Sequence, residues 1–520
     1  MKTDTGSTTD KTIGIEIARD GEHTSAWQSD LIQLTSIPAH QPNSIYDVLI
    51  IGGGITGLTA GLRLQNEGKQ CLIADAHTIG FGTTGGTSAH INTFADTTYT
   101  DAESAFGAAG AQLFADAINE GVEIIKNNIN TYKIDCDFEI KKGYLYAEDD
   151  SQAKQLDNIY KGLMNVGVNA NYTNNVPTPV AWQKALVLEN QAQFHPLKYL
   201  QGLQKAYLKA GGIIVENTKI NEIEQEEDIH LARSGNEVFK ARKVIYATHM
   251  PPGITVFTFK CAPYRSYVLG VELTTDNYPD GLIYDLQEPY HYIRTHEIDG
   301  QKYLIAGGND HKTGHDDPGK AFEDLEKYVR KYYQVSSVKY KWSSQYYIPV
   351  DGLPYIGHVP GKAEGIYCAT GFNGNGMMLG TISGKILSDL TAGKESKYEK
   401  VFSTTRIKPI DGFTEFVKEN ADVAYHFIAD RLSVQDTDSL KTLNNDSGKV
   451  VEVDGKKIAA YRDKDGNLHA LNPVCTHAKC IVNWNQEEKS WDCPCHGARY
   501  DINGIVLTGP ADMDLQQITL

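Results

Sequence analysis

The chain has 520 residues, of which 41% are hydrophobic and 22% are charged, and this length predicts at least two domains because single cores stop growing near ~300 residues. Its formal net charge of −17 argues against nucleic acid as a partner, since a strongly acidic surface repels phosphate groups. No apolar run approaches the ~18 residues that a membrane-spanning helix needs, so no transmembrane segment is predicted.

Residues 1–45 are predicted to form an N-terminal tail. This stretch contains neither the apolar segment of a secretory signal nor a twin arginine, so we expect a cytoplasmic protein. Four of the eight cysteines lie within residues 475–495. In a reducing compartment, such a cluster indicates a metal site more than a purely structural disulfide framework.

A strand, a glycine-rich turn and a helix follow one another after residue 46. The apolar run 47–51 (DVLII) is typical of a buried parallel strand, and GGGITG at 52–57 opens the helix LTAGLRLQNEG. The next strand ends in Asp75, 23 residues beyond Gly52, where a carboxylate binds ribose hydroxyls. This order predicts a dinucleotide site and leaves FAD and NAD both open. Its residues are Gly52, Gly53, Gly54, Ile55, Thr56, Gly57, Asp75 and Ala76.

A second glycine-rich segment favours FAD over NAD. DGLPYIG (351–357) precedes a predicted strand, and FNGNGM (372–377) opens a long helix. The N-terminus of a helix presents free N–H groups and the positive end of the helix dipole. Both suit the electron-rich pyrimidine edge of a reduced flavin, whereas NAD has no such need.

Residues 46–395 resemble the FAD-dependent amino-acid oxidase (DAO-type) family, which includes glycine and sarcosine oxidases. The resemblance rests on GGGITG, GFGTTGGTSAH (80–90), KVIYATH (243–249), DGLPYIG and FNGNGM. It implies an α/β (α+β) Rossmann-type FAD-binding domain with an inserted antiparallel-sheet substrate subdomain within about 140–345. It also implies that Thr83, Thr84, Thr87 and Ser88 line the flavin or its phosphates and that the main chain of Ile220 contacts adenine. Gly376 and Met377 are expected at the flavin pyrimidine, and Gly374 also belongs to the predicted cofactor site. For the threonines, a solvated loop is the alternative.

Residues 396–435 are predicted to link this domain to the next. Within them, residues 413–432 (FTEFVKENADVAYHFIADRL) have apolar residues at helical spacing and are interpreted as a docking helix. A plain solvent-facing linker is the alternative.

The last predicted domain, residues 436–520, carries a cysteine and a histidine in each of two short motifs. They are CTH at 475–477 and CPCH at 493–496. Two thiolates on one iron and two imidazoles on the other describe a Rieske [2Fe–2S] centre. A Cys2His2 zinc site is the alternative, but zinc fingers of this composition place both cysteines before both histidines. The predicted ligands are Cys475, His477, Cys493 and His496.

This segment is similar to Rieske proteins of the respiratory-complex type, which implies a small all-β domain. The same resemblance implies a disulfide between Cys480 and Cys495 that joins the two cluster loops. It assigns Tyr500 a hydrogen bond to a ligand sulfur. Lys479 stands where glycine is usual, so if the backbone there is left-handed, lysine costs about 1 kcal/mol or forces a different loop.

Catalytic candidates come from the inserted subdomain. Relatives of the glycine-oxidase type hold the substrate carboxylate with an arginine five residues before DG, where this chain has Tyr346. In PYHYIRT (289–295), alternation places Tyr290, Tyr292 and Arg294 on one strand face, which predicts an alternative anion clamp; a surface strand with an ordinary salt bridge fits equally well. His311 is a candidate base, with a structural histidine as the alternative.

The two cofactors, FAD and the [2Fe–2S] cluster, predict a reaction. A flavin accepts two electrons and releases them singly, while a Rieske centre carries one. We expect dehydrogenation of a small-molecule C–N (amine or amino acid) or C–O substrate, then one-electron transfer to the cluster and to an external acceptor. The sequence leaves a protein, a quinone and oxygen open as that acceptor.

Three other functions are alternatives to this dehydrogenation. An NAD(P)H-dependent reductase would need a second strand–GxGxxG–helix unit, which the sequence lacks. A Rieske oxygenase would need two histidines and a carboxylate for a mononuclear iron, and only 24 residues follow His496. A non-enzymatic electron-transfer or redox-sensor flavoprotein is the remaining alternative.

Overall fold

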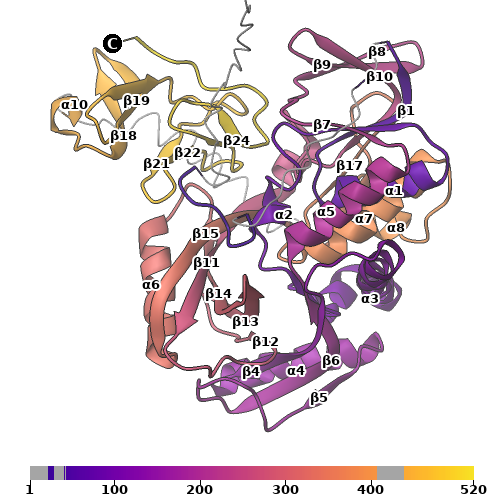
Figure 1. Cartoon of the computed structure of the whole chain (residues 1–520), viewed down its shortest axis with the longest axis vertical. Coiled ribbons are helices and arrows are strands. Elements are labelled where there is room, and N and C mark those ends of the chain that lie inside the picture. The colour runs from indigo at the N-terminus through magenta and orange to yellow at the C-terminus, as the bar shows by residue number, and fades with distance from the viewer. Residues whose placement is uncertain (1–20, 29–39, 41–42, 407–438, 520) are drawn as a thin grey trace, which may run out of the picture.

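The computed structural model describes residues 21–28, 40, 43–406 and 439–519. The predicted docking helix at 413–432 lies outside the described residues. In the part of the chain that is described, no helix is long and apolar enough to cross a bilayer. Figure 1 shows two large sheets with their helices and a smaller C-terminal β-rich part beside them.

The first sheet has the strand order β16-β17-β10-β1-β2-β7. From β17 to β7 the strands run parallel, while β16 and the β8–β9 hairpin are antiparallel additions. The predicted strand at 47–51 is buried on both faces, because alternate residues enter two different cores. The strands are β1 (Ile45–Ile51), β2 (Cys71–Ala74), β7 (Ile213–Val215), β8 (Glu222–Glu226), β9 (Ile229–Ser234), β10 (Glu237–Tyr246), β16 (Tyr355–His358) and β17 (Ile366–Thr370).

Long helices pack against one another beside this sheet (Figure 1). Helix α1 contacts both α5 and α7, and α3 contacts α7. The approach of α7 to α1 requires glycine, since a Cβ at Gly384 would lie 2.7 Å from the carbonyl oxygen of Thr56. The helices of this part, including the short α2 and α8, are α1 (Ile55–Asn66), α2 (Thr83–Gly86), α3 (Tyr99–Tyr132), α5 (Pro196–Lys209), α7 (Gly376–Thr391) and α8 (Glu399–Phe402).

The second sheet has the order β15-β11-β14-β13-β12-β4-β6-β3, with β5 paired to β6. All of its pairings are antiparallel except β4 with β12. Apart from β3, it is built from residues 139–193 and 261–349, and the chain between them returns to the first sheet. The strands are β3 (His90–Ile91), β4 (Glu139–Ala147), β5 (Ala170–Tyr172), β6 (Lys184–Gln193), β11 (Cys261–Leu273), β12 (Leu282–Tyr284), β13 (His291–Ile298), β14 (Gln301–Lys312) and β15 (Val335–Pro349).

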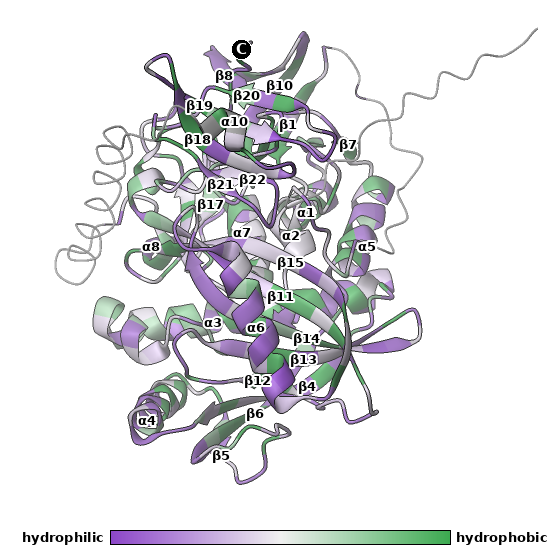
Figure 2. Cartoon of the chain, turned by 90° about the vertical axis from the view of Figure 1, so that its left-hand side faces the viewer, coloured by the Kyte–Doolittle hydropathy of each residue, from purple (hydrophilic) through white to green (hydrophobic). Residues whose placement is uncertain are grey.

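Two helices cover this second sheet. Helix α4 (Asp150–Asn165) contacts β4 and β6, and α6 (Pro318–Tyr332) contacts β11 and β14. The buried face of α6 carries Phe322, Leu325 and Val329, while most of the other residues of this helix are hydrophilic, as its largely purple ribbon shows (Figure 2). This pattern of apolar residues on one face explains why 318–332 folds as a helix against a sheet.

The C-terminal part consists of two small antiparallel sheets, β18-β19-β20 and β21-β22-β23-β24. They lie beside the ends of β11 and β15 (Figure 1). Its elements are α10 (Ser439–Thr442), β18 (Ser447–Val453), β19 (Lys456–Arg462), β20 (Leu468–Leu471), β21 (Asn483–Asn485), β22 (Ser490–Asp492), β23 (Arg499–Tyr500) and β24 (Val506–Thr508).

Residues 21–28, within the predicted N-terminal tail, contact both the part that contains the two large sheets and the C-terminal part. Trp27 is 0% exposed, and its Nε1 donates a hydrogen bond of 2.6 Å to the carbonyl oxygen of Thr87. Ser25 Oγ donates to the carbonyl oxygen of Gly85 at 2.5 Å. Glu22 lies 3.8 Å from Lys464 of the C-terminal part. This segment therefore contacts both the 83–88 loop and the C-terminal domain.

Candidate functional site

The backbone of the turn between β1 and α1 lies at the wall of a cavity. Gly52 has a left-handed φ of 108°, and a Cβ on Gly57 would lie 1.9 Å from the carbonyl oxygen of Gly52. Helix α1 begins after Gly54, which has no side chain to cap it, and Ile55 N donates a hydrogen bond of 3.2 Å to Thr84 Oγ1 at the wall of the cavity. Its first turn therefore directs N–H groups and the positive end of the helix dipole toward the cavity, which suits a pyrophosphate.

Asp75, at the end of β2, is held in place by backbone N–H groups. Its Oδ2 accepts a hydrogen bond from Gly53 N at 2.7 Å, and its Oδ1 accepts one from His77 N at 2.8 Å. Burial raises the pKa of Asp75, while these two hydrogen bonds oppose the shift. The carboxylate is thereby oriented at the wall of the cavity, where it suits a ribose hydroxyl pair.

One cavity collects the residues that were predicted to bind the cofactor, except for Gly53 and Gly57. The members that line it are Gly52, Gly54, Ile55, Thr56, Asp75, Ala76, Thr83, Thr84, Thr87, Ser88, Ile220, Gly374, Gly376 and Met377. The glycine-lined turn and the helix start at the cavity wall fit FAD. A bound flavin would supply two-electron chemistry with substrate and one-electron release.

The cavity also has lining residues that were not selected from the sequence. His249 closes the KVIYATH segment, and Asn373 and Asn375 lie within FNGNGM, so these motifs could have indicated them. Asp96 lies between β3 and α3, outside any sequence motif that could have indicated it. Residues 506–509, 511 and 512 of the C-terminal domain also line the cavity, which only the tertiary structure reveals.

We expect Gly57→Ala to lower FAD affinity at least tenfold, which corresponds to about 1.4 kcal/mol. The added Cβ cannot coexist with the carbonyl of Gly52 unless the turn moves away from the pyrophosphate. The measurement is the flavin-to-protein ratio after dialysis against graded FAD. Gly68→Asn is the matched control, because Gly68 lies after the other end of α1 with nothing within 4 Å, and asparagine tolerates its φ of 81°. A normal flavin content in Gly57→Ala would contradict this assignment.

Four tyrosines line the cavity on the side of the second sheet, and we call this region the tyrosine end. They are Tyr284, Tyr290, Tyr292 and Tyr346. The Tyr346 hydroxyl donates to Asp310 Oδ2 at 2.7 Å, and the Tyr292 hydroxyl lies 3.0 Å from Ser266 Oγ. Tyr346, which stands at the arginine position of glycine-oxidase-like relatives, thus meets a carboxylate.

Arg294 and His311 do not line this cavity. The Arg294 guanidinium is fully buried, donates to the carbonyl oxygens of Ala89 and Phe194, and lies 4.9 Å from the ring centre of Trp27. The His311 ring lies 2.7 Å from the Tyr267 hydroxyl through Nε2 and 3.0 Å from its neighbour's carbonyl through Nδ1. The structure therefore brings Tyr290, Tyr292 and Tyr346 together without these two residues.

The four predicted cluster ligands lie in two adjacent loops, after β20 and after β22. The rings of His477 and His496 are 5.0 Å apart between centroids, and all four of their ring nitrogens are buried without a hydrogen-bond partner. Cys475 and Cys493 are buried free thiols. Two thiols and two imidazoles with unsatisfied nitrogens fit a Rieske centre, which would supply one-electron chemistry. The hydroxyl of Tyr500 lies 3.2 Å from Cys475 Sγ.

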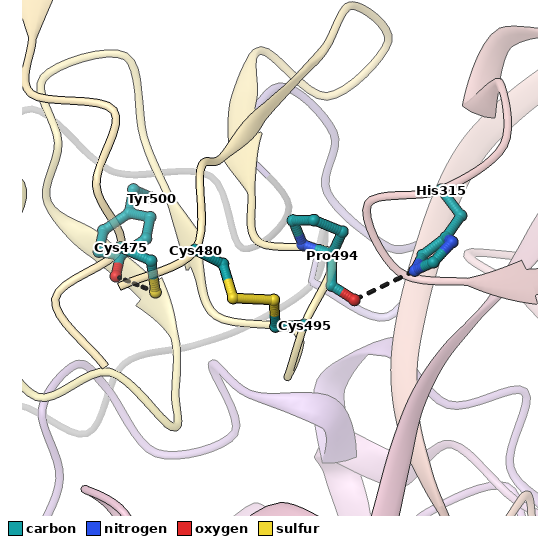
Figure 3. Close-up of a disulfide and its surroundings, with 6 residues drawn as sticks. All are labelled: His315, Cys475, Cys480, Pro494, Cys495 and Tyr500. Carbon is teal, nitrogen blue, oxygen red and sulfur yellow. Dashed lines mark hydrogen bonds between the residues drawn. A yellow bond between two sulfur atoms is a disulfide. The ribbon is translucent and has the colours of Figure 1, made fainter. Parts of the chain in front are cut away.

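A disulfide between Cys480 and Cys495 ties these loops together, with a Cα–Cα separation of 6.5 Å (Figure 3). Three sulfur atoms, those of Cys480, Cys493 and Cys495, lie within 4.8 Å of one another. Because two of them are bonded to each other, they are not available as metal ligands, and Cys493 is left for iron. Lys479, beside the disulfide, has a left-handed φ of 63°.

Tyr500→Phe is expected to lower the reduction potential of the cluster. A hydrogen bond to sulfur stabilises the more negative, reduced cluster, so its loss costs about 1 kcal/mol, or roughly 40 mV for a one-electron couple. An EPR-monitored redox titration measures this shift. Tyr461→Phe is the control, because its hydroxyl bonds Asp446 instead. An unchanged potential in Tyr500→Phe would show that this hydroxyl does not act on the cluster.

A buried ion network joins the C-terminal domain to β11. Glu488, with a side chain 0% exposed, pairs with Arg265 at 2.6 Å and with Arg499 at 2.5 Å. Ser343 also bonds this carboxylate. Although burial alone would raise it, the two guanidinium groups bring the pKa of Glu488 down to about 2. This part of the contact between the domains is therefore charged and shielded from solvent.

The cluster loops themselves contact the flavin domain. Gln345 lines the cavity and donates from Nε2 to the carbonyl oxygen of Gly497 at 3.0 Å, immediately after the predicted ligand His496. His315 Nε2 lies 3.1 Å from the carbonyl oxygen of Pro494 (Figure 3). The ring of Phe259 lies 6.1 Å from that of His496. The histidine side of the cluster site thus faces the domain that holds the cavity.

Comparisons with known proteins agree with this arrangement. Residues 47–390 match the family model for FAD dependent oxidoreductases, and residues 432–519 match that for the Rieske [2Fe-2S] domain. The chain is 33% identical over 493 residues to YhfW of Bacillus subtilis (strain 168), a protein named for a Rieske 2Fe-2S iron-sulfur centre. That match covers 94% of this chain and 96% of YhfW.

Two further similarities concern the flavin domain. Gamma-glutamylputrescine oxidoreductase of Escherichia coli (strain K12) is 23% identical over 403 residues, which cover 75% of this chain and 93% of that protein. The crystal structure of glycine oxidase from Geobacillus kaustophilus has a TM-score of 0.57 at 18% identity and covers 70% of this chain and 99% of that one, a likeness of fold. The chain therefore belongs to the FAD dependent oxidoreductase (DAO) family and carries a Rieske [2Fe-2S] domain on the same polypeptide.

Proposed function

We propose that the protein dehydrogenates a small C–N or C–O substrate at FAD and passes the electrons one at a time to its own Rieske cluster. One observation carries this proposal: the loop that holds His496 is hydrogen-bonded, through Gln345, to the wall of the flavin cavity. Residues 506–509, 511 and 512 of the Rieske domain support it, since they form part of that same cavity wall. The two redox sites then share one interface.

A C–N substrate is favoured within this proposal. The name of the E. coli relative points to an amine derivative, γ-glutamylputrescine, as the compound on which that protein acts. Tyr346 at the arginine position of glycine-oxidase-like relatives weakens an amino-acid substrate. We also propose that the cluster passes its electrons to an external acceptor and that the protein is located in the cytoplasm.

Anaerobic mixing of the purified full-length protein with pooled small amines and amino acids tests the proposal, followed by NAD(P)H in a separate sample. We expect an amine pool to bleach the flavin absorbance while a Rieske EPR signal appears. Cys475→Ser, which removes one cluster ligand, is the control: the flavin should still bleach, without the Rieske signal. Bleaching by NAD(P)H instead would overturn the proposed substrate class.

The alternative is a non-enzymatic electron-transfer or redox-sensor flavoprotein. It predicts that no substrate pool bleaches the flavin, although a chemical reductant reduces both centres reversibly. That result, together with reduction by a protein donor, would replace dehydrogenation as the function.

A further inference from the structure

The charges around the tyrosine end indicate which kind of substrate it accepts. Asp96 lines the cavity directly and accepts hydrogen bonds from Gly374 N at 3.0 Å and from Asn375 Nδ2 at 3.4 Å. Gly374 and Asn375 also line the cavity and precede α7, so this carboxylate is fixed at the junction between the flavin-side wall and the tyrosines.

A second carboxylate lies behind the tyrosines. Asp310, on β14, accepts from Tyr346 at 2.7 Å, and its other oxygen, Oδ1, is enclosed without a partner that satisfies hydrogen-bond geometry. Burial raises the pKa of Asp310 to about 7, with a further contribution from the charge of Asp96. Burial likewise raises the pKa of Tyr290, and both carboxylates add to that shift. Asp96 and Asp310 therefore both influence the electrostatic potential at the tyrosine end of the cavity.

The basic side chains nearby are already engaged. Arg265 is bonded to Glu488 and Ser343. His90 Nδ1 lies 2.8 Å from the Tyr284 hydroxyl, and burial holds the pKa of His90 well below its usual value, so the ring is neutral. Arg294 donates to backbone carbonyls outside the cavity. Arg499, which also lines the cavity, is bonded to Glu488 and Asp492. Among the described residues at this end, each guanidinium is thus committed to protein groups, whereas Asp96 and Asp310 have no basic side chain as a hydrogen-bond partner.

We propose that the tyrosine end is a cation cage that binds its substrate as an ammonium group, with Asp96 as the direct ionic partner and aromatic rings around it. The substrate class is an aliphatic amine without a carboxylate next to the reacting carbon. An ammonium ion is attracted both to carboxylates and to the faces of tyrosine rings. A carboxylate placed here would meet Asp96 and Asp310 with no counter-charge, which is costly in an enclosed site.

This inference rests on the proposed function only in placing the substrate at this end, and it is tested by binding. Butylamine, butanol, butyrate and 2-aminobutyrate share a four-carbon chain and differ in charge. Anaerobic titration of the flavin-loaded full-length protein, read by calorimetry and by the shift of the flavin spectrum, gives the Kd of each. We expect butylamine to bind at least tenfold more tightly than the other three.

Asp96→Asn should weaken butylamine binding at least tenfold and leave butanol unaffected. Asp276→Asn is the matched control, because it removes the same charge from a side chain that is 81% exposed. Equal or tighter binding of butyrate or 2-aminobutyrate, or no binding of butylamine, would overturn the cage. The order of the four probes in the unaltered protein decides this even where Asp96→Asn loses its flavin.

The two hypotheses fail in different ways. If butylamine binds selectively but no amine bleaches the flavin, the cage stands and the proposed dehydrogenation does not. If a substrate pool bleaches the flavin while the probes show no preference for the cation, dehydrogenation stands and the cage does not.

Discussion

Replacing Glu488 with glutamine is expected to loosen the Rieske domain from the flavin domain, at a cost of roughly 3–5 kcal/mol in the stability of the interface. The substitution removes the counter-charge that Arg265 and Arg499 share, and Arg499 keeps a further buried ion pair, with Asp492 at 2.9 Å. Both side chains are at most 2% exposed, so water cannot replace the carboxylate. The loss should therefore greatly exceed that of a surface ion pair.

Hydrogen–deuterium exchange of β11 and β22 measures this loss, because both strands flank the network. Glu487→Gln is the matched control: its carboxylate, next in the chain, pairs with Lys341 at 2.5 Å but is 30% exposed, so about 0–1 kcal/mol is expected. Equal exchange protection in the two variants would show that the buried network does not hold the domains together.

The same network predicts how the interface responds to acid. The pKa of Glu488 is lowered from 4.5 to about 2, so the folded interface favours the charged form. Its contribution is complete above about pH 4.5 and is lost as the pH falls toward 2. Exchange protection of β11 should therefore weaken as the pH falls from about 4.5 to about 2, and less so in Glu488→Gln.

Local patterns were enough to predict the two cofactors, FAD and the [2Fe–2S] cluster. The order of strand, GGGITG and helix determines a turn whose shape depends only on neighbouring residues, and the structure has β1 and α1 at these positions. The CTH and CPCH motifs carry the cluster chemistry in the residues themselves. The left-handed backbone at Lys479 could be anticipated from the glycine that is usual there.

Features that depend on long-range packing could not be predicted in this way. Alternation places Tyr292 and Arg294 on one side of β13, but it cannot tell that one side chain reaches the cavity while the other reaches Phe194. Glu488 occurs in the polar run NQEEKS, which is typical of an exposed turn, and only the fold buries it. Trp27 follows a stretch with no periodic pattern, although it is completely buried.

Replacing both Cys480 and Cys495 with serine is expected to destabilise the cluster loops by about 3 kcal/mol. The disulfide joins two residues with a sequence separation of 15. A cross-link of that length lowers the conformational entropy of the unfolded chain, which stabilises the folded state by about 3 kcal/mol. The bond also joins the loop of Cys475 and His477 to the loop of Cys493 and His496. Its loss should therefore let the two pairs of iron ligands separate, and the cluster should dissociate more readily.

The urea concentration at which half of the Rieske EPR signal disappears measures this effect. It should fall clearly in the double variant, whereas Cys368→Ala, which removes a buried free thiol from the flavin sheet, should leave it unchanged. Flavin content should stay the same in both variants, because neither Cys480 nor Cys495 lines the flavin cavity. If the Rieske signal of the double variant survives to the same urea concentration, the ligands alone hold the loops together and the disulfide adds no stability to the cluster.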